Sequence, residues 1–273
     1  MKKILQIISQ NISKFIVKIL SLHKFSNLFL DNIIQHGFER KISIKHEDIK
    51  MIFYIPNSLC HWRVKTFSTK EPETLNWIGN FKENSCIWDV GANIGLYSIY
   101  SGLLGHKVFC FEPSFSNLEI LAKNIDLNDL NNNITILPIA LNDKSKISEL
   151  NLSDFKWGAA HSAFEKKFGW DGKDLNTTLS YRTLGFSIDD ISKYLKMLPP
   201  DHIKVDVDGI ENLVLSGGVN TISKAKSVLI EVTKNFQSQS SGVKNILKDL
   251  DFNLINEFKT SEYSYNQIWN KNI

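Results

Sequence analysis

Apolar residues recur every three or four positions near the N-terminus, at Ile4, Ile8, Ile12, Phe15 and Ile19. This period places them on one face of a helix. The first 30 residues contain several lysines and no acidic residue. We expect the helix to pack on the rest of the protein or on a second subunit of a homo-oligomer. The alternative is that residues 1–36 lie on an anionic membrane surface.

A different pattern begins after this segment. Alternating apolar residues at 41–56 predict a hairpin that turns near Glu47 and Asp48. Ser68 or Thr69 is expected to begin a helix that ends near Gly79. Beyond it, short apolar runs predict strands at 86–90, 107–111, 134–141, 203–207, 227–232, 252–258 and 265–269. Helical periodicity predicts helices at 94–104, 115–128, 188–198, 211–222 and 243–250.

The order of these elements predicts an α/β fold. Strands that alternate with helices form a parallel sheet covered on both faces. The last two strands have only a short polar link, 259–264, and must therefore pair antiparallel. Pro138 makes the third strand an edge or bulged strand, and the polar stretch 142–181 is expected to be an insertion or lid. We divide the chain into a helical and hairpin segment, 1–67, and a catalytic domain, 68–273.

Composition narrows the possible functions. The 273 residues are 42% hydrophobic and 22% charged, as in a globular protein. The net charge of +3 predicts no general affinity for nucleic acid. The cysteines, Cys60, Cys86 and Cys110, are odd in number and have no CxxC spacing, which indicates neither a disulfide framework nor a zinc site. Reduced thiols in a cytoplasmic protein are expected.

The loop after the first predicted strand carries the candidate cofactor site, Asp89-Val-Gly91-Ala-Asn93-Ile-Gly95. Gly91 lets the backbone turn and approach a ligand, and Gly95 permits close packing of helix on strand. Glu112 ends the second strand, where a carboxylate can accept ribose hydroxyls. The glycine spacing matches neither a dinucleotide fingerprint nor a P-loop. Asp89 suits a cationic ligand, and S-adenosylmethionine carries a sulfonium and an ammonium. The alternative is a purely structural turn in which Asp89 caps the helix.

Four blocks in order resemble the FkbM-type S-adenosylmethionine-dependent methyltransferases: Asp89 to Gly95, Phe111-Glu112-Pro113, Ile203 to Glu211, and Leu229-Ile230-Glu231. Residues 71–74 and 183–191 resemble the family as well, so the likeness runs from about residue 70 to the end. It implies a class I methyltransferase fold of seven strands with an antiparallel last strand, and methyl transfer to oxygen. Two departures stand out. Asp208 replaces a usual Glu, and Gly185-Phe186 interrupts a usual run near Asp189.

Three carboxylates, Asp206, Asp208 and Glu211, cluster after the fourth predicted parallel strand. Clustered like charges raise pKa values, which favours Asp206 as a general base. Asp208 and Glu211 are expected to bind the acceptor. A divalent cation is the alternative, but no further acidic pair completes an obvious oxygen cage, so no metal site is assigned.

Two further residues are candidates. His161 lies in the predicted lid and is the second candidate for the base, although an ordinary surface histidine fits equally well. Asn142 follows the third strand, where this fold commonly meets the adenine edge of the cofactor.

Together these features predict an O-methyltransferase that uses S-adenosylmethionine on a hydroxyl of a glycan or related secondary metabolite. The alternatives are an N- or protein methyltransferase, and a non-catalytic scaffold of the same fold. We expect a cytoplasmic protein, with possible peripheral contact at the inner membrane face through residues 1–36.

Overall fold

The computed structural model describes residues 2–22 and 24–271. At its centre is a seven-stranded sheet in the order β12-β13-β11-β10-β3-β4-β5. Within it β13 pairs antiparallel with both of its neighbours, and the other pairings are parallel. This order confirms the predicted class I methyltransferase fold. The strands are β3 Cys86–Val90, β4 Lys107–Phe111, β5 Ile134–Leu137, β10 His202–Val205, β11 Ser227–Thr233, β12 Phe252–Lys259 and β13 Ser264–Lys271.

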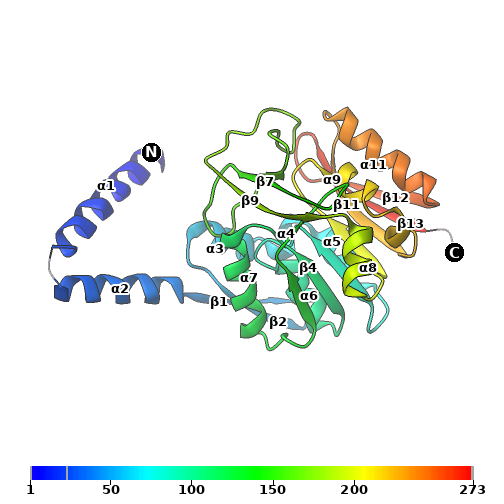
Figure 1. Cartoon of the computed structure of the whole chain (residues 1–273). Helices are drawn as coiled ribbons and strands as arrows, with labels where there is room; N and C mark the ends of the chain where they lie inside the picture. The colour runs from blue at the N-terminus through cyan, green and yellow to red at the C-terminus, as the bar shows by residue number, and fades with distance from the viewer. Residues whose placement is uncertain (1, 23, 272–273) are drawn as a thin grey trace.

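Helices cover both faces of this sheet, as Figure 1 shows. Each face needs cover because the central strands are apolar on both sides, and all residues of β3 are buried. One core lies between the sheet and α5 Pro72–Gly79, α6 Leu96–Leu103 and α7 Phe115–Leu127. The other lies under α8 Ile188–Leu195, α9 Glu211–Ser216, α10 Val219–Ile222 and α11 Gln237–Asp249. The single predicted helix 211–222 is thus two short helices, α9 and α10.

The predicted hairpin is present as β1 Lys41–His46 and β2 Ile49–Tyr54. It packs on α7, where Asn124 and Asn128 accept the backbone N–H groups of Tyr54 and Ile52 at 2.8 and 2.9 Å. Met51 is fully buried in the core that α6 and α7 share. The hairpin therefore contributes to the core of the catalytic domain.

The segment that follows the hairpin differs from the prediction. Helix α3, Ser58–Lys65, was not predicted, and Asn57 caps it by accepting the N–H of Cys60 at 2.8 Å. The next helix does not begin at Ser68 or Thr69. Those residues belong to α4, Phe67–Lys70, and Glu71 is the residue before α5. Pro72 explains the break, because the residue before a proline avoids helical geometry.

The polar stretch 142–181, expected to be an insertion or lid, contributes most of a second sheet. Its order is β6-β9-β7-β8, from β6 Ala140–Leu141, β7 Lys146–Leu152, β8 Ser162–Phe164 and β9 Leu179–Phe186. Pro138 ends β5, which is an edge strand as predicted, and the chain then passes into this second sheet. Buried Leu150 and Phe164 join it to the core of the main sheet. We call this sheet with its connecting segments, residues 140–186, the lid sheet.

The N-terminal helices α1, Lys2–Leu20, and α2, Lys24–Phe38, project from the rest of the molecule (Figure 1). The expected packing of the first helix on the catalytic domain is wrong, because Ile8 and Phe15 remain 48% and 65% exposed. Among the helices that the structure describes, none combines the length and the apolar content that crossing a bilayer requires.

Candidate active site

The loop between β3 and α6 depends on its glycines. Gly91 and Gly95 have φ values of 87° and 86°, which favour glycine. A Cβ on Gly91 would overlap the backbone carbonyl oxygen of Asp206 on the neighbouring strand. The N–H groups of Gly91 and Ala92 donate to the carbonyl oxygen of Phe111, at 2.9 and 3.2 Å. The loop is thereby held against the ends of β4 and β10.

Glu112 lies beside this loop because Val90 pairs with Phe111 in the sheet. Its carboxylate accepts the backbone N–H groups of Asn93 and Ser114, each at 2.8 Å. Burial raises the pKa of Glu112 to about 7, although these N–H groups oppose the rise. Each oxygen keeps a lone pair for a further donor.

Three of the residues predicted to bind the cofactor, Gly91, Asn93 and Glu112, line one pocket. Its remaining wall is largely apolar and comes from the strand ends and the lid sheet: Phe111, Pro113, Ile139, Leu141, Phe164 and Ile210. We call this hollow the loop pocket. The Asn93 side chain also reaches the lid, donating to the carbonyl of Ala159 at 2.8 Å.

Three other predicted cofactor residues do not line the loop pocket. Asp89 accepts the Ser98 hydroxyl at 2.5 Å, and its Oδ1 is buried without a hydrogen-bond partner. Burial raises its pKa against the effect of nearby Lys204. Gly95 packs against a side chain of α7. Asn142 donates to Glu165 in the lid sheet at 3.2 Å. Asp89 and Gly95 therefore support the loop without lining the pocket, and Asn142 makes its contact within the lid sheet instead.

A second hollow, of about 490 Å³, lies between the carboxyl ends of β10 and β11, helix α3 and the lid sheet. We call it the acidic pocket. It shares Arg63, Asp206 and Asp208 with the loop pocket, so the two meet at these residues. Its other polar and aromatic lining includes Trp62, Lys70, Glu71, His161, Trp170 and Glu231.

Asp206 stands where the two pockets meet. Lys204, which is 3% exposed, lies 3.0 Å from its carboxylate. Burial alone would raise the pKa of Asp206, but the Lys204 ammonium outweighs it and holds the pKa below its usual range. The expectation that the acidic cluster raises the pKa of this residue is therefore wrong. Asp206 is ionised, and a carboxylate with a lowered pKa is a weak base.

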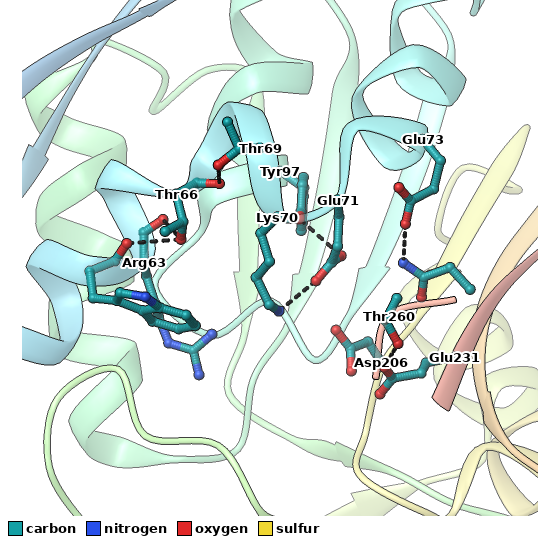
Figure 2. Close-up of polar contacts among 12 residues, drawn as sticks. Arg63, Thr66, Thr69, Lys70, Glu71, Glu73, Tyr97, Asp206, Glu231 and Thr260 are labelled. Carbon is teal, nitrogen blue, oxygen red and sulfur yellow. Dashed lines mark hydrogen bonds and ion pairs between the residues drawn. The ribbon is translucent and has the colours of Figure 1, made fainter. Parts of the chain in front are cut away.

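Glu71 and Glu231 were not predicted as site residues. Figure 2 shows their carboxylates turned toward the space beside Asp206. Glu71 accepts the Lys70 ammonium at 2.6 Å and the Tyr97 hydroxyl at 2.9 Å. Glu231 follows Ile230, which pairs with Val205, and this register brings it level with Asp206.

The environment of Glu231 is unusual for a carboxyl group. Burial and the neighbouring Asp206 charge raise its pKa to about 9. It is therefore protonated at neutral pH. Its Oε1 accepts the Thr260 hydroxyl at 3.0 Å (Figure 2). The pocket thus holds an ionised and a neutral carboxyl group side by side.

Asp208 and His161 lie in contact, and both have positive φ values, of 60° and 63°. The backbone N–H of His161 donates to Asp208 Oδ2 at 2.7 Å, and the ring Nδ1 lies 3.6 Å from Oδ1. Burial and the Asp206 charge raise the pKa of Asp208. The His161 ring is half exposed and lines the acidic pocket.

Glu211, expected to bind the acceptor, lines neither pocket. Its carboxylate accepts the N–H groups of Val207 and Gly209 at 3.2 and 3.1 Å. Gln239 also donates to it, at 2.6 Å. Burial raises its pKa to about 7. Glu211 therefore stabilises the turn that carries Asp206 and Asp208.

No group of three His, Cys, Asp or Glu side chains within residues 2–22 and 24–271 is arranged to hold a metal ion. The three cysteines are free and buried.

Comparison with known proteins shows a family match and a distant relative. The model of the methyltransferase FkbM domain matches residues 89–254. The hexuronic acid methyltransferase AglP of Haloferax volcanii is 23% identical over 171 residues, which cover 63% of this chain and 65% of the relative. The chain thus spans just under two thirds of the length of that relative.

Solved structures with a similar arrangement are more distant in sequence. A precorrin-6y C5,15-methyltransferase from Geobacter metallireducens is 11% identical, with a TM-score of 0.44, and the match covers 74% of this chain and 87% of that one. TrmK of M. capricolum, solved with S-adenosyl-homocysteine, is 13% identical, with a TM-score of 0.45 and coverage of 72% and 67%.

Proposed function

Because the chain belongs to the methyltransferase FkbM domain family, we propose that this methyltransferase moves a methyl group from S-adenosylmethionine to a hydroxyl group of a sugar. The acceptor is a glycan or a related hydroxylated metabolite. The observation that carries the proposal is the meeting of the loop pocket and the acidic pocket at Asp206 and Asp208.

The loop pocket suits S-adenosylmethionine. Glu112 offers a carboxylate for two ribose hydroxyls, and the apolar wall suits a purine ring. The cofactor's sulfonium and ammonium charges match the ionised Asp206, where the two pockets meet. When bound, S-adenosylmethionine supplies an electrophilic methyl group.

The acidic pocket suits a sugar. Trp62 and Trp170 provide flat apolar surfaces, and the carboxyl groups of Glu71, Asp206 and Glu231 provide hydrogen-bond partners for hydroxyls. Glu231, which is protonated, can donate, whereas Asp206 accepts. Aromatic faces beside carboxyl groups thus match the alternating apolar and hydroxylated surfaces of a sugar ring.

Arg63 indicates which sugars the acidic pocket would prefer. Its Nε donates to the carbonyl of Gly158 at 2.6 Å, which fixes the guanidinium at the junction of the two pockets. A guanidinium at this position suits an acceptor that carries a carboxylate. The likeness to a hexuronic acid methyltransferase supports sugar acids as the first acceptors to test.

His161 is the proposed base for the acceptor hydroxyl. A sugar hydroxyl becomes a good nucleophile only as its proton is removed. The His161 ring lines the acidic pocket, and Asp208 holds the backbone of that residue. The lowered pKa of Asp206 makes it the weaker of the two predicted bases, and its charge serves better to orient the ligands.

The test is a transfer assay with radiolabelled S-adenosylmethionine and a panel of oligosaccharides, with and without hexuronic acid units. Label should enter a sugar as an alkali-stable ether, and preferentially the acidic sugars. Label in a protein or at a nitrogen would contradict the proposed acceptor, and alkali-labile label would indicate a methyl ester.

A further inference from the structure

Helix α1 presents an uncovered apolar face. Ile4, Ile8, Ile12, Phe15 and Ile19 repeat at intervals of three and four, and each is between 48% and 65% exposed. The helix has 19 residues, which corresponds to a length of about 28 Å. An apolar face of this length requires a partner in solution.

The neighbouring helix does not supply that partner. Leu28, Phe29, Ile33 and Ile34 of α2 are themselves 49–60% exposed. Figure 1 shows both helices extending away from the two sheets, with α2 leading into β1. The apolar side chains of both helices are thus exposed, on elements that extend away from the sheets.

The charge of this segment indicates the nature of the partner. Lys14 and Lys18 lie one helical turn apart on α1 and are exposed. The sequence adds Lys2, Lys3 and Lys24, and the first acidic residue of the chain is Asp31. A second copy of α1 would bring these positive charges face to face, which is unfavourable.

An anionic lipid surface matches both properties of the segment. An apolar helical face flanked by lysines inserts into the boundary between headgroups and acyl chains, and the lysines pair with anionic headgroups. Lysines at the border of such a face extend their ammonium groups toward the headgroups. The helix would lie in the plane of the membrane, consistent with the finding that no described helix can span one.

We propose that α1, together with the apolar side of α2, docks the protein on the surface of an anionic lipid bilayer. The docking does not depend on the proposed sugar acceptor.

The experiment is co-flotation of the full chain with vesicles. One set consists of phosphatidylcholine alone, and the other of equal parts phosphatidylcholine and phosphatidylglycerol. The protein should float with the anionic vesicles, and the binding should weaken as salt is added. No flotation, or equal flotation with both sets, would overturn the proposal.

Two matched double variants separate the role of α1 from that of net charge. Lys14→Gln with Lys18→Gln should weaken binding to anionic vesicles about 30-fold. Lys244→Gln with Lys248→Gln removes the same charge from the exposed face of α11 and should leave binding unchanged. Equal losses in the two variants would contradict a specific role for α1.

A third variant tests the apolar face and a second copy as the rival partner. Ile8→Gln with Phe15→Gln should abolish flotation and leave the mass in solution, measured by light scattering, unchanged. If the wild-type chain is instead a stable dimer that this variant splits, and the dimer does not float, the partner is a second copy and the proposal is wrong.

Discussion

The backbone N–H of His161 donates to the Asp208 carboxylate at 2.7 Å, which ties the lid sheet to the turn after β10. Both residues have positive φ values, so the chain bends sharply on each side of this contact. The half-exposed His161 ring is therefore presented to the acidic pocket from a fixed backbone. The base that we propose is positioned by a residue that the sequence suggested for acceptor binding.

His161→Gln should lower kcat by about 10²–10⁴-fold, the usual contribution of a positioned base. Affinity for S-adenosylmethionine should stay nearly unchanged, because His161 does not line the loop pocket. Single-turnover rates and a separate binding titration measure the two effects. Asp206→Asn is the comparison. If it loses turnover while His161→Gln retains it, the assignment of the base is reversed.

Asp208→Asn should reduce kcat less than His161→Gln does. The amide keeps an oxygen that can accept the N–H of His161, but it removes the charge beside the ring. Asp208→Ala should reduce kcat more than Asp208→Asn does, because alanine cannot accept the backbone N–H of His161. The order of the three rates checks the positioning role, and identical rates for Asn and Ala would contradict it.

Gly91→Ala should destabilise the fold by about 2–4 kcal/mol, combining backbone strain with overlap in a packed site. Its Cβ would collide with the Asp206 carbonyl oxygen at a φ of 87°. Urea denaturation measures the change. Gly37→Ala in α2 is the control, because its Cβ would meet no atom within 4 Å. A Gly91→Ala protein as stable as wild type would show that the loop can accommodate a Cβ at this position, contrary to the account.

Glu211→Gln tests a structural role through pH. In the folded protein the pKa of Glu211 is raised by burial to about 7, whereas the ordinary pKa of a glutamate is 4.5. The folded state therefore binds more protons across this window, and wild-type stability falls as pH rises through it. Glutamine does not titrate, so the variant lacks this loss. The free energy of unfolding of the variant minus that of the wild type should therefore increase between pH 5 and about 7. If the difference in free energy of unfolding between variant and wild type does not change with pH, the pKa of Glu211 is not raised.

Glu112 should make cofactor binding pH-dependent. Its pKa is raised to about 7 by burial, and ribose hydroxyls donate better to the ionised form. Affinity for S-adenosylmethionine should therefore rise as pH increases through 7 and then level off. Glu112→Gln, which cannot ionise, should flatten the profile in fluorescence or calorimetric titrations. An unchanged profile in that variant would assign the pH dependence to another group.

The sequence predicted the centre of the main sheet well because strands such as β3 and β10 are short apolar runs buried on both faces. The predicted bounds of β3 and β4 agree with the structure. The pairing of Val90 with Phe111 then brings Gly91 and Glu112 together, so that half of the loop pocket follows from strand order.

The acidic pocket was harder to predict because its walls come from segments without a clear period. Helix α3, SLCHWRVK, mixes apolar and basic residues, so no helix was predicted there and Arg63 was not a candidate residue. In the lid sheet, strands β7 and β9 are only partly buried, so the sequence predicted an insertion or lid there without its strands. Glu231 lay within a recognised family block, but its closeness to Asp206 depends on the register of β10 and β11. That Lys204 pairs with Asp206, among the clustered carboxylates, and that this pairing lowers the pKa of Asp206 could be learned only from the folded structure.

The most direct test of the account is a calorimetric titration of S-adenosylmethionine into the wild-type protein and Glu112→Ala. We predict saturable one-to-one binding to the wild type. The variant should bind more weakly by about 1.5–3 kcal/mol, the range for hydrogen bonds to a charged group. No binding to the wild type, or equal affinity in the two proteins, would contradict the assignment of the loop pocket to the cofactor.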